Sequence, residues 1–194
     1  MDETGILRRQ LGLKSENQIF QHISIYINTF QFNMQNYHLN NRPNREITSE
    51  SEIQEILKNG KYTTISMCRD NEPYIVTLSY GYDEESSTLY FHCAKKGLKL
   101  DFLEANPTVC ATVIEDGGYV IDQCEHNFRS AVFWGEMGIV TEMEEKKYGV
   151  AILVKHLESN PTAIQRLLLK SDEAFSRMDI LKLKITQIHA KAGK

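Results

Sequence analysis

Three strand-like runs follow one another between residues 62 and 92, and only short turns separate them. Tyr62–Cys68 leads into the turn Arg69–Pro73, the second run is Tyr74–Tyr82, and the acidic turn Asp83–Ser87 precedes Thr88–His92. Turns this short join antiparallel neighbours, whereas parallel strands need a crossover of about a dozen residues or more. This part of the chain is therefore constrained to an antiparallel sheet.

A helix with both ends marked precedes these strands. In "ITSESEIQEILKNG" Ser49 can cap the first turn, and Glu52 is its reciprocal partner three residues later. The pair Asn59-Gly60 predicts that the helix ends in a left-handed backbone conformation.

The second half of the chain adds longer elements. Gly97–Ala105 predicts a short helix that ends at Asn106-Pro107. The pattern then predicts a strand at Val109–Ile114, a loop at Glu115–Asn127 and a second strand at Phe128–Thr141. Two helices, Glu144–Ser159 and Thr162–Lys170, and a last strand, Ile180–His189, follow. Six strands with few parallel crossovers predict a mainly β fold, an antiparallel β-barrel with peripheral helices.

The first 44 residues differ in composition from the rest. Residues 1–44 are rich in Asn and Gln, and "ISIYINTFQF" within them alternates in the way of a β-strand. This extension could be an added strand, a partner-binding arm or a poorly ordered tail, and its residues suggest no chemistry. We expect two parts: the extension 1–44, of unknown role, and a domain formed by 45–194.

Bulk composition excludes several classes of protein. A net charge of −4 gives no support to general nucleic-acid binding, which usually needs a basic domain. No apolar run approaches the roughly 18 residues of a membrane span. The N-terminus "MDETGILRRQ" lacks the apolar stretch of a secretory signal. We expect a cytoplasmic protein that binds neither nucleic acid nor membranes.

The four cysteines indicate a reducing compartment. Cys68, Cys93, Cys110 and Cys124 include no pair at CxxC spacing, so a disulfide framework is not expected. Cys124 and His126 could be two metal ligands, but no second pair at zinc spacing accompanies them. No metal site is predicted.

Three lysines surround one glycine where a strand meets the short helix. Lys95 and Lys96 precede Gly97, and Lys99 lies in the first helical turn. Cations are unfavourable at a helix N-terminus, whereas its free N–H groups bind phosphates and other anions. The cluster is either an anion site or a solvated basic turn.

Four segments in this order resemble the flavin-binding split-barrel family related to pyridoxamine 5′-phosphate oxidase, in particular its nitroimidazole-resistance-like branch. They are "REITSESEIQEIL", "YTTISMCRDNEPYIVTLSYGYD", "LYFHCAKKGLKLDFLEANP" and "FRSAVFWGEMGIVTEMEEK". The resemblance covers residues 45–141 and the closing strand. It implies a six-stranded antiparallel split barrel that forms a homodimer with FMN at the subunit interface.

The resemblance also implies roles for individual residues. Lys99 matches the basic residue that binds the FMN phosphate, and Lys96 is a second candidate contact. His92 matches the position at the flavin edge, facing the small-molecule pocket, and is the candidate catalytic residue. The other implied cofactor contacts are a strand along the flavin ring and one serine: Val76, Thr77, Leu78, Ser79 and Ser130.

The chain departs from the oxidase branch of this family. It lacks the arginine expected near Ile75 or Val76, the Ser or Arg near Gly97 and Leu98, and the arginine- and histidine-rich C-terminal motif. These departures argue against oxidation of pyridoxamine phosphate. The first expectation is an FMN-dependent oxidoreductase acting on a small molecule, in which the cofactor carries the chemistry. The alternatives are a flavin-binding sensor or carrier without turnover, a heme- or deazaflavin-binding split barrel, and a structural protein with an empty pocket.

Overall fold

The computed structural model describes residues 43–168, 175 and 178–193. The contacts within the chain divide it into two units, Met1–Arg45 and Glu46–Lys194. The first contributes one short described element, the 3₁₀ turn η1 at Pro43–Arg45. The strand-like run "ISIYINTFQF" lies outside the described residues. Everything below concerns the second unit.

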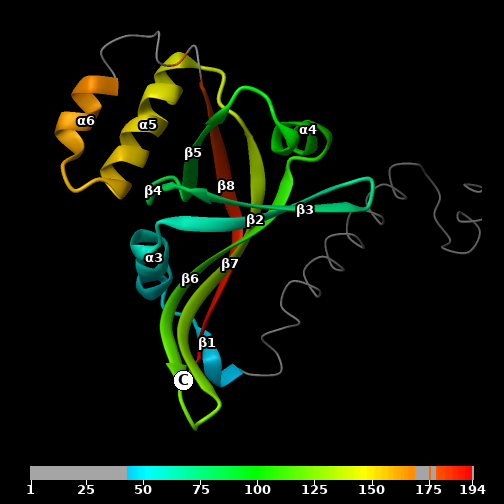
Figure 1. Ribbon diagram of the computed structural model, residues 1–194, viewed down its shortest axis with the longest axis vertical. Coiled ribbons are helices and arrows are strands. Elements are labelled where there is room, and N and C mark those ends of the chain that lie inside the picture. Colours follow the sequence, from blue (N-terminus) through cyan, green and yellow to red (C-terminus); the bar gives the residue numbers. More distant parts are fainter. Residues whose placement is uncertain (1–42, 169–174, 176–177, 194) are drawn as a thin grey trace, which may run out of the picture. The chain divides into compact units, whose positions relative to one another are not determined.

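The described strands form one antiparallel sheet (Figure 1). The sheet order is β3-β2-β6-β7-β8-β5-β4, and β1 pairs with β8. The strands are β1 Glu46–Ile47, β2 Tyr62–Arg69, β3 Glu72–Ser79, β4 Gly81–Asp83, β5 Thr88–Ala94, β6 Thr108–Val120, β7 Glu125–Ile139 and β8 Met178–Gly193. The predicted mainly β, antiparallel class is confirmed. The strand count is eight rather than six, since β1 was not predicted and the expected strand Tyr74–Tyr82 is divided in two.

A single residue closes this sheet into a barrel. The two ends of the sheet, β3 and β4, are consecutive in the chain and only Tyr80 separates them. Tyr80 is fully buried, and its hydroxyl donates to the carbonyl oxygen of Leu57 at 2.6 Å. Because one residue cannot span a wide gap, the sheet must curl until its two ends meet.

Helix α3 (Glu50–Asn59) begins as predicted but ends differently. The backbone N–H of Glu52 donates to the Ser49 hydroxyl at 3.5 Å, so Ser49 is confirmed as the cap, whereas no reciprocal bond to the Glu52 side chain forms among the described residues. The predicted left-handed end is wrong, because Gly60 has φ −62° and ψ 141°. A Cβ there would lie 2.5 Å from both the Tyr80 hydroxyl and a methyl of Val113. Glycine is needed at this position for space and not for its backbone freedom.

The longest hairpin, β6–β7, replaces a predicted loop. Glu115–Asn127 was expected to be irregular, but the strands run on to Val120 and resume at Glu125. A register shift between Asp116 and Tyr119 accommodates the two glycines. The polar residues here have weak β propensity, and cross-strand pairing overrides it.

In the described part of the chain three further helices lie outside the barrel: α4 Leu98–Ala105, α5 Met143–Leu157 and α6 Pro161–Leu168. The barrel interior holds the main core, with Phe91, Phe133 and Leu181 fully buried. A second cluster joins α5 to the outer side of β5 and β8, with Tyr90 and Val150 among its members. Burial of each such side chain contributes about 1.5–3 kcal/mol.

Among the described helices, none is both long and apolar enough to cross a membrane.

Candidate functional site

The basic joint between β5 and α4 has the geometry of an anion site. Gly97 has φ +148°, a conformation that L side chains rarely adopt, and a Cβ there would meet nothing within 4 Å. This glycine is therefore required by the backbone. No side chain caps the start of α4. The first N–H groups of the helix thus remain available to a ligand.

A hollow of about 720 Å³ opens beside this helix start. Lys95, Lys96 and Gly97 line one side, and Gly138 and Ile139 at the end of β7 line another. Two carboxylates of α4 also reach it, those of Asp101 and Glu104. The hollow therefore combines two ammonium groups and two carboxylates with free backbone donors at the helix start.

Lys99 is half-buried and acts on the strand side of the joint. Burial raises the pKa of the Cys93 thiol, and the nearby Lys99 ammonium partly offsets this rise. Cys93 belongs to the core-facing side of β5. The Lys99 ammonium therefore lies near Cys93, whereas Lys96 lines the hollow beside α4.

The four predicted β3 residues occupy a strand at the end of the sheet. Val76 and Leu78 pack against the core, whereas Thr77 and Ser79 are exposed. The Thr77 hydroxyl lies 3.0 Å from that of Thr64 on β2. Among the described strands β3 pairs with β2 alone, so the backbone of its other edge has no strand partner. That edge can accept a flat polar ligand through its N–H and C=O groups.

His92 points away from the barrel core, because Phe91 and Cys93 on either side of it are buried. It lines a hollow of about 300 Å³ whose other walls are mainly apolar side chains of α5, α6 and β8. Val150, Leu153 and Ile164 are among them. This environment combines one ring that can donate or accept a proton with an apolar cavity.

Ser130 lies elsewhere, on β7. It is buried and lines a shallow hollow on the outer face of β6, β7 and β8, together with Ile114 and Phe128. His126 and Asp116 also line this hollow, and they bond each other across the β6–β7 hairpin at 2.8 Å. No group of three His, Cys, Asp or Glu that could hold a metal occurs in the described part of the chain.

A single chain does not bring the predicted residues into one cavity. Lys96, His92 and Ser130 line three different hollows, and β3 contributes an edge of the sheet. Of the two lysines predicted to contact the phosphate, Lys96 lines the hollow beside α4 and Lys99 does not. The assignment of these residues to one cofactor stays a prediction, and it requires a second subunit to complete the site.

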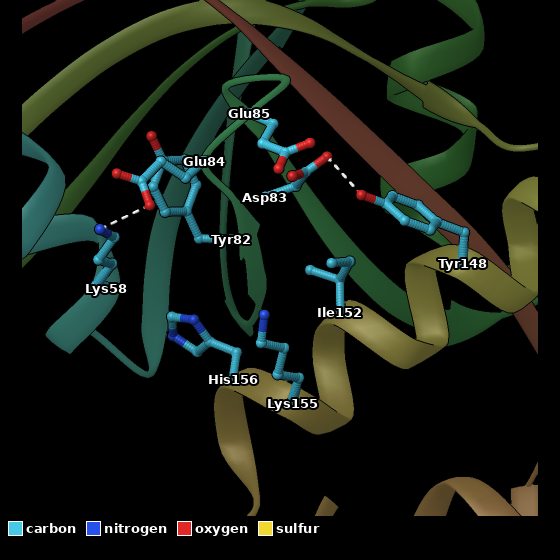
Figure 2. A pocket seen from close by; sticks show the side chains of 9 residues that line it. All are labelled: Lys58, Tyr82, Asp83, Glu84, Glu85, Tyr148, Ile152, Lys155 and His156. Atoms are coloured by element: carbon cyan, nitrogen blue, oxygen red, sulfur yellow. Dashed lines mark hydrogen bonds and ion pairs between the residues drawn. The ribbon is translucent and has the colours of Figure 1, made fainter.

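One further hollow was missed by sequence reasoning (Figure 2). Its residues come from α3, from β4 with the turn after it, and from α5, and they include Tyr82, Asp83 and His156. Asp83 was expected in an acidic turn, but it is the last residue of β4 and is buried. No local signal distinguishes it from the neighbouring Glu84 and Glu85, because its burial depends on α5.

Sequence comparison connects the chain with one family. A sequence model of the family described as pyridoxamine 5′-phosphate oxidase matches residues 49–192. A curated relative, an uncharacterized protein of Rhizobium meliloti, is 29% identical over 69 residues, or 36% of this chain and 44% of that protein. The chain thus matches less than half the length of this relative.

Solved structures share the fold. A candidate 5-nitroimidazole antibiotic resistance protein of Bacteroides thetaiotaomicron has a TM-score of 0.64 at 24% identity, covering 76% of this chain and 86% of that chain. An FAD-binding protein of Mesorhizobium loti has a TM-score of 0.58 at 19% identity, and the match covers 77% of this chain and 98% of that chain. An FAD and heme binding protein of Mycobacterium smegmatis has a TM-score of 0.61 at 16% identity, and the match covers 77% of this chain and 74% of that chain. At these identities the similarity establishes the fold alone.

Proposed function

Since the chain belongs to the pyridoxamine 5′-phosphate oxidase family, we propose that it is an FMN-binding oxidoreductase that acts on a small molecule. The observation that carries the proposal is the start of α4, which has no side-chain cap and lies beside Lys95 and Lys96. The flavin-binding proteins among its structural neighbours support the same cofactor class.

The residues present fit a flavin monophosphate. The phosphate would lie at the free N–H groups of α4, where Gly97 lets the backbone approach and the lysines supply positive charge. The ring would lie along the free backbone edge of β3, at Val76–Ser79. Because the donors form one compact cluster, they suit a single phosphate group better than an extended diphosphate.

When bound, the flavin supplies hydride or electron transfer. The protein's part is to hold a small substrate, and His92 is the residue we assign to it. Its ring lies at an apolar hollow, where it can orient a substrate or give it a proton. Apolar neighbours such as Val150 and Leu153 exclude water from such a substrate.

The proposed assembly is a homodimer with FMN at the interface. The separation of Ser130 and Lys96 within one chain supports it, since a partner's β7 face could complete the site.

We also propose a cytoplasmic location, because all four cysteines are free thiols, as a reducing compartment favours.

An absorption spectrum of the purified protein, before and after addition of FMN, tests the proposal. We expect flavin bands, together with oxidation of a reduced nicotinamide when a nitro compound or quinone is offered. Flavin without turnover would favour the sensor or carrier. A Soret band would favour a heme protein, as one neighbour's heme binding suggests. Colourless protein that takes up no FMN would overturn flavin binding.

A further inference from the structure

The hollow that sequence reasoning missed is built like a small-molecule site. It has a volume of about 440 Å³, within the range of ligand pockets. Lys58 comes from α3, Tyr82 and Asp83 come from β4, and Lys155 and His156 come from α5. None of the residues assigned above to the flavin or its substrate lines it. A ligand here would therefore be independent of the proposed function.

Asp83 is the anchor of this hollow. Only 7% of the surface of this residue is exposed to solvent. One carboxylate oxygen, Oδ2, accepts hydrogen bonds from the Ser86 hydroxyl at 2.5 Å and the Tyr148 hydroxyl at 3.1 Å. No donor among the described residues bonds the other oxygen, Oδ1. Since buried carboxylates are normally satisfied by several donors, Asp83 has capacity for one more donor from a ligand.

The hollow also offers a neutral acceptor. His156 Nε2 lies 2.6 Å from the carbonyl oxygen of Gly60, so this nitrogen carries the hydrogen and Nδ1 keeps its lone pair. Burial lowers the pKa of His156 below its ordinary value, which favours the neutral ring. This acceptor gives the hollow a second polar contact for ligand N–H groups, in addition to Asp83.

The cations of the hollow are not equivalent. Lys58 is already paired with Glu84 at 2.7 Å. Lys155 forms no ion pair with any described residue, and its side chain extends into the hollow across from the β4–β5 turn (Figure 2). Its ammonium is therefore available to a ligand carboxylate, while the side chain of Ile152 and the ring of Tyr82 give apolar surface nearby.

A metal ion does not account for these groups. Asp83, Glu84 and Glu85 follow one another, yet no three metal-binding side chains converge in the described part of the chain. One open carboxylate oxygen and one free ammonium in the same cavity instead match a molecule that carries both charges.

We propose that this hollow binds a small zwitterion of the α-amino-acid class, whose ammonium pairs with Asp83 and whose carboxylate pairs with Lys155. The ligand side chain lies against Ile152 and Tyr82. The site is separate from the proposed flavin site, and either could exist without the other.

Calorimetric titration of the full chain tests this site with three free amino acids: L-leucine, L-phenylalanine and L-arginine. The tightest of the three is then compared with its N-acetyl derivative, which lacks the ammonium, and its methyl ester, which lacks the carboxylate. We expect millimolar or tighter binding of the free amino acid. Each derivative should bind about ten- to a hundredfold more weakly, since each loses one charge-assisted contact.

Two variants assign the two ends of the ligand. Asp83→Asn should weaken the free amino acid and the ester about tenfold or more. Lys155 is exposed, so Lys155→Gln should not affect folding. In this variant the free amino acid should bind no more tightly than its methyl ester. Asp122→Asn is the matched control, an exposed aspartate in the β6–β7 turn, and should change nothing.

Three results would overturn the proposal: no binding of any free amino acid, equal binding of the N-acetyl derivative, or unchanged binding in Lys155→Gln. The last variant keeps the test decisive if Asp83→Asn does not fold. A saturating amount of FMN should leave the amino-acid titration unchanged. Competition between the two would place the amino acid at the flavin hollow and contradict a separate site.

Discussion

Two positions of this chain, Gly97 and Gly60, require glycine for different physical reasons. Gly97 adopts φ +148° in open space, so its lack of a side chain permits a conformation. Gly60 has an ordinary extended conformation, but a Cβ would collide with Tyr80 and Val113. Sequence alone marks both as turn residues. Only the second is fixed by packing, and it lies where α3 meets the residue that closes the barrel.

Replacement of Gly60 by alanine should destabilise the protein by about 1–3 kcal/mol, as overpacking of a close contact does. The nearest atoms would be the Tyr80 hydroxyl and a Val113 methyl, both held in the core. Urea unfolding measures the effect. Gly138→Ala is the control, because its Cβ would meet nothing within 4 Å. Equal stability of the two variants would show that Gly60 is not constrained by space.

Reversal of the charge at Lys99 tests the phosphate assignment. Lys99→Glu should weaken FMN by about two to three orders of magnitude, because an attraction is lost and a repulsion gained. Riboflavin, which has the same ring and no phosphate, should be affected far less. Fluorescence titration of both ligands gives the comparison. Arg166→Glu makes the same charge change on exposed α6 and serves as control. If FMN affinity stays within about a factor of two, the lysines form only a solvated turn.

At the scale of elements, α5 lines two of the four hollows described above. Its apolar residues form the walls beside His92, and its last turn supplies Lys155 and His156 to the other hollow. The His156 ring also packs on Tyr80 at 4.9 Å and bonds the carbonyl of Gly60, so the C-terminal ends of α3 and α5 are joined through it. This helix therefore holds the barrel closure and two candidate sites in place.

The His156 contact predicts a pH dependence of stability. Burial holds the pKa of His156 below its ordinary value of 6.5 in the folded state. As the pH falls through 6.5 the unfolded chain binds a proton that the folded chain does not, so the free energy of unfolding decreases. His156→Gln can still donate to Gly60 but does not titrate. Unfolding at a series of pH values should show a shallower acid-side fall in this variant, and parallel curves would contradict the prediction.

At the scale of the whole molecule, the outer face of β6 and β7 carries exposed apolar side chains. Ile114 on β6 is 58% exposed and lines a hollow together with Phe128 and Ser130 of β7, and Ile121 in the turn after β6 is 77% exposed. Isolated apolar residues are ordinary at a surface, but Ile114 and Phe128 line the same hollow, and exposed apolar side chains gathered at a hollow are typical of an interface. This face is where we place the second subunit of the proposed homodimer.

A charge at the centre of that face should separate the subunits. Ile114→Glu should weaken dimerisation by at least about tenfold, because a carboxylate would be buried in an apolar contact. Loss of FMN affinity should accompany the monomer, as the cofactor would lose one wall. Sedimentation velocity and FMN titration measure the two effects. Met143→Glu, on α5, is the control. A monomeric wild type that binds FMN tightly would contradict the assembly.

The sequence by itself determined the elements whose signals are local. Short turns imposed the antiparallel sheet, and Ser49 marked the start of α3. It also located the basic joint, because Gly97 and the lysines are neighbours in the chain. These features depend on residues a few positions apart, where backbone geometry and hydrogen bonding act directly.

The tertiary structure decided what depends on distant residues. The hairpin β6–β7 replaced a loop because Arg129 bonds Glu115 across it, at 2.6 Å, and Glu55 of α3, at 2.8 Å. Asp83 became a buried anchor only because Tyr148, 65 positions later, donates to it. Local pattern carries no information on such pairs, since packing of separate elements sets both their burial and their neighbours.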